Sequence, residues 1–393
     1  MKNVKIIIGA NYGDEGKGLA TNYFSKCAKE KNEKTVVVLH NGGFQRGHTV
    51  IHNNIRHVFH CFNSGTFEGA TTFYASEFIL NPMFFKEEYE KLTSLGFTPK
   101  IYADARCRIT TPYDVMINQI VEEYRDTKRH GSCGYGIFET IKRDIQIPFT
   151  LKDVIKNNLE DFTANILFRI RESYTFYRLE EHGLKNVPIK NIQMILNNNI
   201  VTKYIEDLKF MIEHIEIKDV NILDSFDTII FEGSQGLLLD QSNIGKTCHL
   251  TPSNTNITNP AKIIKDLKLL GYFKDIDIET LYITRTYLTR HGSGEFTQEC
   301  AKEDINKDMF DETNIHNNYQ GSIRYGYIDI DDLLERIKKD AIKIPDNKYH
   351  LFVTHLNETK NSFFLKEEQL KDVLDIKEVK YISDKETNVK ALF

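Results

Sequence analysis

The sequence has no tryptophan, no long apolar run and no large excess of charge of one sign. No apolar stretch approaches the ~18 residues that a membrane-spanning helix needs, and the opening MKNVKIIIGA becomes polar too soon for a secretory signal. A formal net charge of -5 gives no reason to expect a surface for nucleic acid or anionic membranes. We therefore expect a cytoplasmic protein with small-molecule partners, and no nucleic acid or membrane among them.

Cysteine is also sparse and scattered. The chain has no C-x-x-C pair and no cysteine–histidine spacing suited to zinc. The six positions are Cys27, Cys61, Cys107, Cys133, Cys248 and Cys300. We expect reduced thiols at these positions.

The 393 residues are enough for one large domain or for two or three smaller ones, and composition does not choose between these. Apolar runs that end in glycine or polar turns alternate with amphipathic segments, which is typical of an α/β fold with a largely parallel sheet. The expected strands are Val4–Ile8, Thr35–Leu39, His57–Phe62, Thr228–Phe231, Leu281–Thr286 and His350–Val353. One helix is expected directly after the first glycine turn. Further helices are expected at Pro82–Leu95, Pro112–Arg125, Asp153–Glu181, Thr202–His214, Pro260–Leu270 and Asp331–Ile342.

Residues from about 80 to 224 carry few strand signals, and we interpret them as a mostly helical insertion. The economical prediction is one α/β domain over residues 1–393, with a large, mostly parallel central sheet, flanking helices and this insertion.

A glycine-rich turn joins the first strand to the first helix in VKIIIGANYGDEGKGLATNYFSKCAKE, residues 4–30. Glycines let backbone N–H groups approach an anion and a helix start adds positive potential, so we predict a P-loop-like phosphate turn with Lys17 as its point charge. It is not a Walker A loop, because Gly18 stands where a Ser or Thr would bind Mg²⁺, and Asp14 is the obvious substitute. The alternative is a structural glycine turn with solvated charges.

A second glycine cluster, LHNGGFQRGHTVIHN, follows the next strand and ends at His48. A histidine behind glycines at a strand end is well placed to reach a substrate oxygen, although a lone histidine is more often structural.

Seven motifs, in this order, resemble those of the adenylosuccinate synthetase family: YGDEGKG, NGGFQRGHTV, HVFHCFNSG, HGSCGYGI, FEGSQGLLLD, LTPSNTN and YLTRHGSGEF. The resemblance runs from about Val4 to Asn357, with a weaker echo at YISDKE. It implies a purine nucleotide:amino acid ligase of purine nucleotide biosynthesis. Such an enzyme moves the γ-phosphoryl group of a nucleoside triphosphate to O6 of a 6-oxopurine nucleotide, by default IMP. The amine of an amino acid, by default L-aspartate, then displaces the phosphate.

The resemblance also implies Mg²⁺, a homodimer and a role for each motif residue. Asp14 would be the base at N1 and a Mg²⁺ ligand, with the Gly47 carbonyl as a second ligand, and His48 would be the acid beside O6. Residues implied for catalysis are Asp14, Lys17, His48 and Gln235. Residues implied for the triphosphate are Gly13, Glu15, Gly16, Lys17, Gly18, Thr49, His355, Asn357 and Ser383. Residues implied for the purine monophosphate are Asp14, Gln45, Ser132, Cys133, Arg143, Gln235 and Thr251. Residues implied for the amino acid are Arg290, His291, Gly292, Ser293 and Arg324.

Arg143 aligns with an arginine that reaches the phosphate bound by the neighbouring subunit. Without the resemblance, a solvated charge would be the default interpretation of this residue.

Several positions depart from the family pattern. Gln45 replaces an asparagine and Cys133 a threonine, which alters the monophosphate pocket. In NNYQGSIRYGYID, residues 317–329, the two arginines that would pair with the aspartate carboxylates appear as Gly321 and Ile323. His291 replaces a valine in the amino-acid loop. Two hypotheses follow: the amine donor is not aspartate, or other cations such as Arg290 hold it.

The donor base is a further open point. Asn357, in THLN, stands where the family has an aspartate that accepts two hydrogen bonds from guanine. An asparagine amide can instead donate to adenine N1 and accept from N6, so the donor is GTP or ATP. Alternatively, Asn357 turns outward and Ser383 and backbone groups hold the base.

Two other functions are compatible with the sequence. One is a paralogue with the same chemistry on GMP or dGMP, or with a different amine, as in phage relatives that use ATP. Those relatives lack the catalytic aspartate, whereas this chain keeps it as Asp14. The other is a nucleotide-binding regulatory protein that has lost catalysis, against which intact Asp14, Lys17 and His48 argue.

Overall fold

The computed structural model describes residues 1–126, 129–243, 247, 249–309, 316, 319–366, 370–385 and 388–393. Within them, ten strands form one sheet in the order β19-β18-β15-β11-β1-β10-β2-β5-β7-β9. All neighbours in this sheet are parallel except β18 and β19. Its strands are β1 Lys2–Gly9, β2 Thr35–Leu39, β5 Thr71–Tyr74, β7 Ile101–Ala103, β9 Glu216–Ile217, β10 Thr228–Gly236, β11 Ile276–Arg285, β15 Lys348–Thr354, β18 Val379–Lys385 and β19 Asn388–Ala391. The predicted α/β fold with a large, mostly parallel sheet is confirmed.

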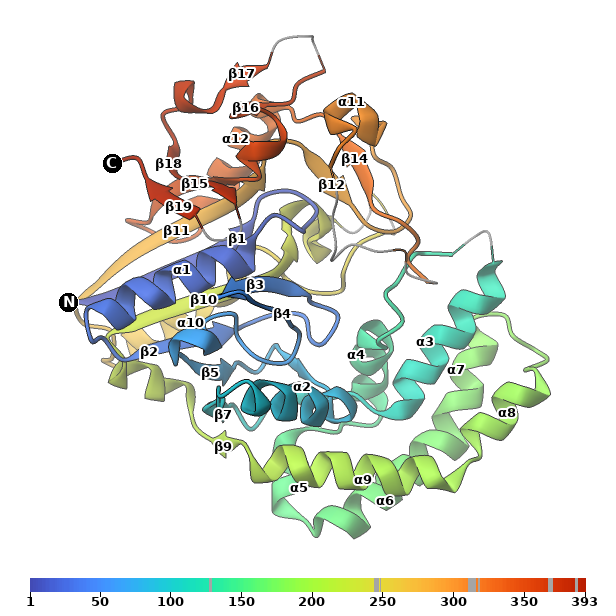
Figure 1. The fold of residues 1–393 in the computed structure, drawn as a ribbon. Helices are drawn as coiled ribbons and strands as arrows, with labels where there is room; N and C mark the ends of the chain where they lie inside the picture. The colour runs from blue at the N-terminus through green and yellow to red at the C-terminus, as the bar shows by residue number, and fades with distance from the viewer. Residues whose placement is uncertain are drawn as a thin grey trace.

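Helices flank this sheet (Figure 1). Their bounds are α1 Lys17–Glu30, α2 Pro82–Ser94, α3 Pro112–Arg125, α4 Ile137–Gln146, α5 Leu151–Lys156, α6 Leu159–Arg169, α7 Phe176–Glu181, α8 Ile189–Ile195, α9 Asn198–Glu213, α10 Thr258–Leu269, α11 Lys302–Asn306 and α12 Ile330–Ala341. Short strands form smaller sheets. They are β3 His48–His52 with β4 Ile55–Phe59, β6 Ile79–Leu80 with β8 Arg108–Ile109, β12 Leu288–Arg290 with β14 Arg324–Gly326 and β13 Glu299–Cys300, and β16 Ser362–Phe363 with β17 Lys371–Asp372.

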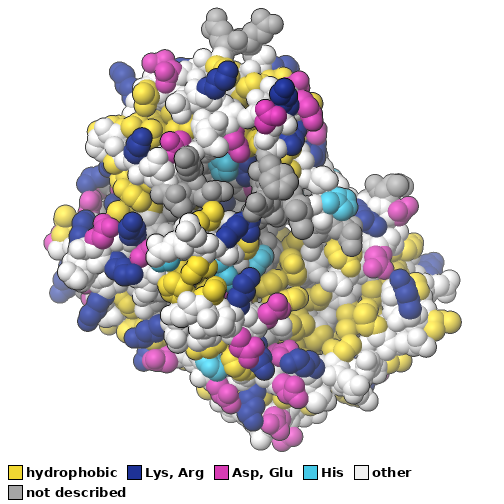
Figure 2. All heavy atoms as spheres, viewed as in Figure 1, with side chains coloured by type: hydrophobic (Ala, Val, Ile, Leu, Met, Phe, Trp, Pro, Cys, Tyr) yellow, Lys and Arg dark blue, Asp and Glu magenta, His cyan; other side chains and the backbone are white. Residues whose placement is uncertain are grey.

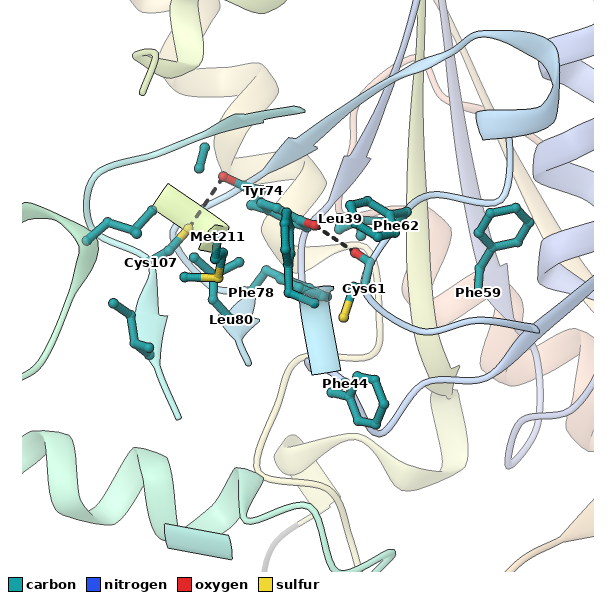
Figure 3. Close-up of a cluster of buried hydrophobic side chains, with 14 of the residues drawn as sticks. Leu39, Phe44, Phe59, Cys61, Phe62, Tyr74, Phe78, Leu80, Cys107 and Met211 are labelled. Carbon is teal, nitrogen blue, oxygen red and sulfur yellow. Dashed lines mark hydrogen bonds between the residues drawn. The ribbon is translucent and has the colours of Figure 1, made fainter. Parts of the chain in front are cut away.

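The central strands are buried on both faces, as near-continuous apolar runs predict. Along β1, Ile7 packs into one core, with residues of α1, α2, α3 and α9. Ile6 and Ile8 point into the other core, with residues of α10 and α12. Figure 3 shows part of the first core, where the Tyr74 hydroxyl donates to the Cys61 carbonyl at 2.9 Å.

The cysteines are free thiols at the five described positions, and Cys248 lies outside the described residues. Burial raises the pKa of the Cys61 and Cys107 thiols well above the usual range, which keeps them protonated and unreactive. In the described residues, no helix combines the length and apolar character that crossing a membrane would require.

Two predicted elements differ from the structure. The predicted strand His57–Phe62 is β4, which pairs antiparallel with β3 and lies outside the central sheet. The predicted helix Asp153–Glu181 is divided into α5, α6 and α7, with a break where the Asn158 side chain caps α6 and a π-helical turn at Ile170–Thr175.

Residues 80–224 hold α2 to α9, which form the lower right part of Figure 1. They also contribute β7 and β9 to the edge of the central sheet, so the segment is not helical throughout. That the chain is one domain with an insertion stays a prediction.

Candidate active site

The predicted functional segments lie where parallel strands of the central sheet end. The glycine turn follows β1, the second glycine loop follows β2, and Gln235 lies at the end of β10. Strands β11 and β15 end at Arg285 and Thr354. Because carboxyl ends of parallel strands share one edge, segments far apart in sequence meet here, where ligands of α/β proteins usually bind.

Backbone geometry in the glycine turn explains its glycines. Gly13, Asp14 and Gly16 have φ angles of 125°, 59° and 92°, and α1 begins at Lys17 directly after Gly16. Such left-handed conformations favour glycine. Among the described residues, none accepts a hydrogen bond from the N–H of Asp14, Glu15 or Gly16. Successive free N–H groups before a helix start suit an anion such as phosphate.

Lys17 and Glu15 form a buried pair beneath the turn, with Lys17 Nζ 3.6 Å from Glu15 Oε2. Burial raises the pKa of Glu15 to about 7, against the opposing effect of Lys17. Glu15 also accepts a hydrogen bond from the Asn11 N–H. The structure therefore holds Lys17 at the base of the turn through a second charge.

His48 belongs to a buried charged cluster with Arg46, Glu232 and Ser64. Its Nδ1 lies 2.6 Å from Glu232 Oε1, and an Arg46 nitrogen lies 2.9 Å from Nδ1 and 2.8 Å from the same oxygen. Ser64 donates to Glu232 from its hydroxyl and its N–H. Burial, reinforced by Arg46, lowers the pKa of His48 to about 4. Burial alone would raise the pKa of Glu232, but Arg46 and His48 lower it to about 2.

Sequence reasoning missed both Arg46 and Glu232. Each lies inside a motif, NGGFQRGHTV and FEGSQG, and Glu232 follows the apolar run TIIF of β10. For Glu232 the signal was a charged residue within a buried strand, because buried charges are almost always paired.

The start of α1, which directly follows the first glycine turn, contacts His48 at the end of the second glycine loop. A Cβ built on Gly18 would lie 2.9 Å from His48 Cβ and 3.2 Å from the Thr49 carbonyl. Only a residue without a side chain allows this approach, which brings the start of α1 against His48. Thr49 itself pairs with Val58 across the β3–β4 hairpin.

The amino-acid loop packs over the same turn. His291 Nε2 lies 3.3 Å from Asp14 Oδ2, so the residue that replaces the family valine contacts the predicted base. The Arg290 guanidinium lies over the Tyr12 ring at 4.6 Å. Figure 2 shows histidine and basic side chains gathered near the centre of this face of the molecule.

The two arginines predicted to hold the amino acid are already engaged. Arg290 donates to the carbonyls of Glu295 and Ser293, at 2.5 and 3.0 Å, and is 3% exposed. Arg324 makes a two-pronged ion pair with Glu299, at 2.8 and 2.5 Å. It also donates to the carbonyls of Gly292 and Gly294. The predicted loop is assembled, but its cations bind groups of the chain itself.

Apart from Asp14 and Arg143, the predicted monophosphate residues come from four segments of the chain. Among the described residues, neither amide atom of the buried Gln45 side chain has a hydrogen-bond partner, and the side-chain oxygen of Gln235 has none either. Buried amides are normally paired, so these groups suit a bound polar ligand. Ser132 Oγ accepts from Asn118 at 2.8 Å, and burial raises the pKa of the Cys133 thiol to about 11. The Thr251 N–H donates to the Leu239 carbonyl.

The loop that carries Ser132 and Cys133 packs against the amino-acid loop. A Cβ on Gly131 would lie 2.6 Å from the Ser293 nitrogen, and Ser293 Oγ donates to the Arg129 carbonyl at 2.9 Å. The structure thus brings these two predicted binding segments together.

Arg143 does not fit its predicted role. Its side chain is fully buried and binds Asp114, Asp144 and the carbonyls of Ile109 and Ile147. With its nitrogens engaged inside its own subunit, the guanidinium cannot reach a phosphate on a neighbour. The exposed cation of α4 is the adjacent Lys142.

The predicted donor-base residues lie at the ends of β15 and β18. His355 has a φ of 59°, and its Nδ1 lies 2.7 Å from Thr354 Oγ1. Asn357 is exposed in a short 3-10 turn, Leu356–Glu358, whereas Ser383 is buried in β18. An exposed Asn357 side chain is available to a base and equally able to face solvent.

The predicted Mg²⁺ ligands are the Asp14 carboxylate and the Gly47 carbonyl, both hard oxygen donors of the kind Mg²⁺ prefers. In the described part of the chain, no three His, Cys, Asp or Glu side chains are grouped to hold a metal. Mg²⁺ usually keeps waters and binds through one or two protein ligands plus substrate phosphates, so the residues present fit it.

Comparisons with known proteins point to one family. The family model described as adenylosuccinate synthetase matches residues 6–356. Curated adenylosuccinate synthetases of Coxiella burnetii and Mycoplasma mycoides are 28% and 29% identical over 77% and 76% of this chain. The chain spans 66% and 65% of the length of these two relatives.

Two solved structures share the fold. Fully ligated adenylosuccinate synthetase from Plasmodium falciparum has a TM-score of 0.66 at 18% identity, over 99% of this chain and 87% of that chain. Cyanophage S-2L succinoaminodeoxyadenylate synthetase, bound to dGMP and dATP as an energy donor, has a TM-score of 0.63 at 14% identity, over 100% of this chain and 95% of that chain. From the family match across most of its length, this chain belongs to the adenylosuccinate synthetase family.

Proposed function

We propose that the protein is a C–N ligase that phosphorylates a 6-oxopurine nucleotide at O6 and replaces the phosphate with an amine. The contact between Gly18 and His48 is the observation that carries this proposal. It brings the glycine turn, whose N–H groups of Asp14, Glu15 and Gly16 have no acceptor among the described residues, against a histidine, and the Asp14 carboxylate belongs to the same turn. A lactam oxygen is a poor leaving group and phosphate a good one, which explains why the two functions share one site.

In the first step, Asp14 takes the proton from purine N1, and O6 attacks the γ-phosphorus and displaces the nucleoside diphosphate. Lys17 and the N–H groups of the turn stabilise charge on the phosphates. When bound by Asp14 and the Gly47 carbonyl, Mg²⁺ would neutralise further phosphate charge.

His48 acts beside O6 through Nε2, because Nδ1 faces Glu232 and Arg46. Its low pKa makes the ring neutral at pH 7. The 2.6 Å contact with the ionised Glu232 carboxylate places the proton of the neutral ring on Nδ1, which donates to Glu232 and leaves Nε2 as an acceptor. Nε2 therefore donates to O6 only when the ring takes a second proton, a state that the negative charge of bound phosphates favours. In the second step the amine attacks C6 and loses a proton, the C6–O6 bond breaks, and O6 leaves as part of inorganic phosphate.

IMP and L-aspartate are the default substrates. A paralogue that uses GMP, dGMP or another amine is the second candidate, because Gly321 and Ile323 supply no cation and both Arg290 and Arg324 already bind partners. The donor is GTP or ATP, and Asn357 favours ATP by its complementarity to adenine. We also propose that the chain acts as a homodimer.

A matrix of reactions tests this function. Phosphate release and product mass are measured with IMP, GMP and dGMP against the twenty amino acids, with GTP and ATP as donors. Release that requires a purine monophosphate and an amine together supports the ligase, and the productive pair identifies the substrates. A protein that binds triphosphate but releases no phosphate with any pair would be a nucleotide-binding protein without this activity.

The donor arm of the matrix includes Asn357→Asp. If Asn357 contacts the base, this variant shifts the ratio of kcat/KM values toward GTP by roughly tenfold. An unchanged ratio would mean that Asn357 faces solvent and other groups hold the base.

A further inference from the structure

Three side chains from neighbouring strand ends hold the backbone of the glycine turn, and the roles set out above use none of them. Each side chain donates a hydrogen bond to a carbonyl of the turn. Thr289 Oγ1 donates to the Gly13 carbonyl at 3.1 Å, and Arg285 Nε donates to the Asp14 carbonyl at 2.5 Å. Thr354 Oγ1 donates to the Glu15 carbonyl at 2.9 Å. Arg285 and Thr354 are register partners in β11 and β15, and Thr289 follows in β12. Three successive carbonyls of the turn therefore point to donors on these strand ends.

These bonds fix where the N–H groups of the turn point. The described residues contain no cis peptide bond, and in a trans peptide the N–H is opposite the carbonyl. Anchoring the carbonyls of Gly13, Asp14 and Glu15 turns the N–H groups of Asp14, Glu15 and Gly16 away from the three donors. Those are the N–H groups without an acceptor among the described residues. The anchors hold them free for an anionic ligand.

Arg285 also connects the turn to the predicted donor-base segment. Its NH1 donates to the Tyr287 hydroxyl at 2.7 Å, and that hydroxyl donates to Glu358 Oε2 at 2.5 Å. Arg285 and Tyr287 are 4% and 1% exposed, so water does not compete with these bonds. Glu358 is the chain neighbour of Asn357, in the same 3-10 turn.

We propose that Arg285, Thr289 and Thr354 are positioning residues that set the direction of the turn's N–H groups. We further infer that the chain Arg285–Tyr287–Glu358 couples the donor-base segment to the peptide group of Asp14. The inference rests on the proposed function and deepens it: a base seated at Asn357 steadies Glu358, and through Tyr287 and Arg285 it steadies the residue that takes the N1 proton. Neither step requires any of these side chains to touch substrate.

The first arm of the test is equilibrium binding of a nucleoside triphosphate, which does not depend on turnover. Arg285→Lys keeps the charge but loses the fork that binds Asp14 and Tyr287 together, and Thr289→Val loses one anchor with little change in shape. Each should weaken triphosphate binding by about tenfold. The matched control is Tyr282→Phe, which deletes a buried hydroxyl bond to Asp340, 2.9 Å long, on the same strand β11. The control should leave binding unchanged.

The second arm is steady-state kinetics. Tyr287→Phe should lower kcat about tenfold while the KM for triphosphate stays within about threefold, because the coupling acts on alignment. Tyr287→Phe combined with Glu358→Gln should be no slower than the slower single variant, as expected for one connected chain. Melting temperatures show whether Tyr282→Phe loses as much stability as the test variants.

Wild-type binding in Arg285→Lys and Thr289→Val, or equal losses in Tyr282→Phe, would overturn the anchoring role. Unchanged kcat in Tyr287→Phe, or additive losses in the double variant, would overturn the coupling. A wild-type protein without turnover would refute the proposed function instead, and the binding arm would still decide the positioning role.

Discussion

At the scale of single residues, the site depends on charges that the fold keeps out of water. Lys17, Glu15, Arg46 and Glu232 are nearly inaccessible, and each lies close to an opposite charge. Removing one member of such a pair leaves the other unpaired, which costs several kcal/mol. We expect substitutions in the site to fall into two groups: those that lower turnover and those that weaken triphosphate binding.

Asp14→Asn and His48→Ala should each lower turnover by at least ~100-fold while triphosphate binding stays within a few-fold, since proton-transfer groups act mainly in the transition state. Lys17→Ala should instead weaken triphosphate binding itself. Kinetics together with equilibrium binding check both. Near-normal turnover in Asp14→Asn or His48→Ala would remove that residue from the mechanism.

The buried histidines predict acid sensitivity. Burial lowers the pKa of His40 to about 3 and, with Arg46, that of His48 to about 4, both from 6.5. The unfolded chain therefore binds protons below pH 6.5 that the folded chain does not, so each histidine removes about 1.4 kcal/mol of stability per pH unit below 6.5. Glu15 acts in the opposite direction between pH 4.5 and 7, because its pKa is raised to about 7 in the fold.

Comparing His40→Phe with the wild type isolates one histidine from these opposing effects. The stability difference between the two proteins should change by about 2 kcal/mol between pH 6.5 and 5, in favour of the variant at low pH. Denaturant unfolding at several pH values measures it. Parallel stability curves would show that His40 does not titrate in this way.

At the scale of elements, packing between α1 and the β3–β4 hairpin sets the position of His48. Gly18→Ala should displace the hairpin, because the new Cβ would lie 2.9 Å from His48 Cβ. We expect a loss of about 1–3 kcal/mol of stability and a fall in turnover. Gly96→Ala is the control: its Cβ meets no neighbour but its φ is 88°, so it should lose stability without losing turnover. Wild-type turnover in Gly18→Ala would contradict this account.

The elements also show what the sequence could predict. Helix α3 has the bounds that were predicted, and in the structure Thr111 and Asp114 form a capping box with Pro112 as the first helical residue. The strand at β4 was predicted, but its partner depends on pairing that sequence pattern does not reveal. Strand β5, TTFY, was missed because four residues are too few to show an apolar run or an alternation, although all four residue types favour strands.

The same limit applies within the site. The motifs indicated which segments belong to the candidate site, and in the structure the parallel strands bring these segments to one edge of the sheet. They could not show which side of α4 faces inward, so Arg143 was assigned to a neighbour that it cannot reach. Nor could they show that Arg290 binds carbonyls of its own loop. Side-chain direction is decided by tertiary packing, which no local spacing records.

At the scale of the whole molecule, the outer face of α4 is the surface we expect to join two copies. Phe138 and Ile145, seven residues apart on one face, are 43% and 75% exposed, with Lys142 between them. Exposed apolar groups on one helix face suit a two-fold contact. Ile145→Asp should shift a dimer toward monomers in sedimentation, whereas Leu269→Asp on α10, at a residue 76% exposed, should not. A wild-type monomer at micromolar concentration, or an equal effect of both variants, would exclude this interface.

The central claim is that one site phosphorylates O6 of the purine and then replaces the phosphorylated oxygen with an amine. The direct measurement uses the purine monophosphate that is productive in the reaction matrix, labelled with ¹⁸O at C6, followed by mass spectrometry of the phosphate released. Attack by O6 on the γ-phosphorus predicts that the released phosphate carries the ¹⁸O label, one atom per turnover. Unlabelled phosphate, formed while the amine product accumulates, would show that O6 is never phosphorylated and would contradict the account.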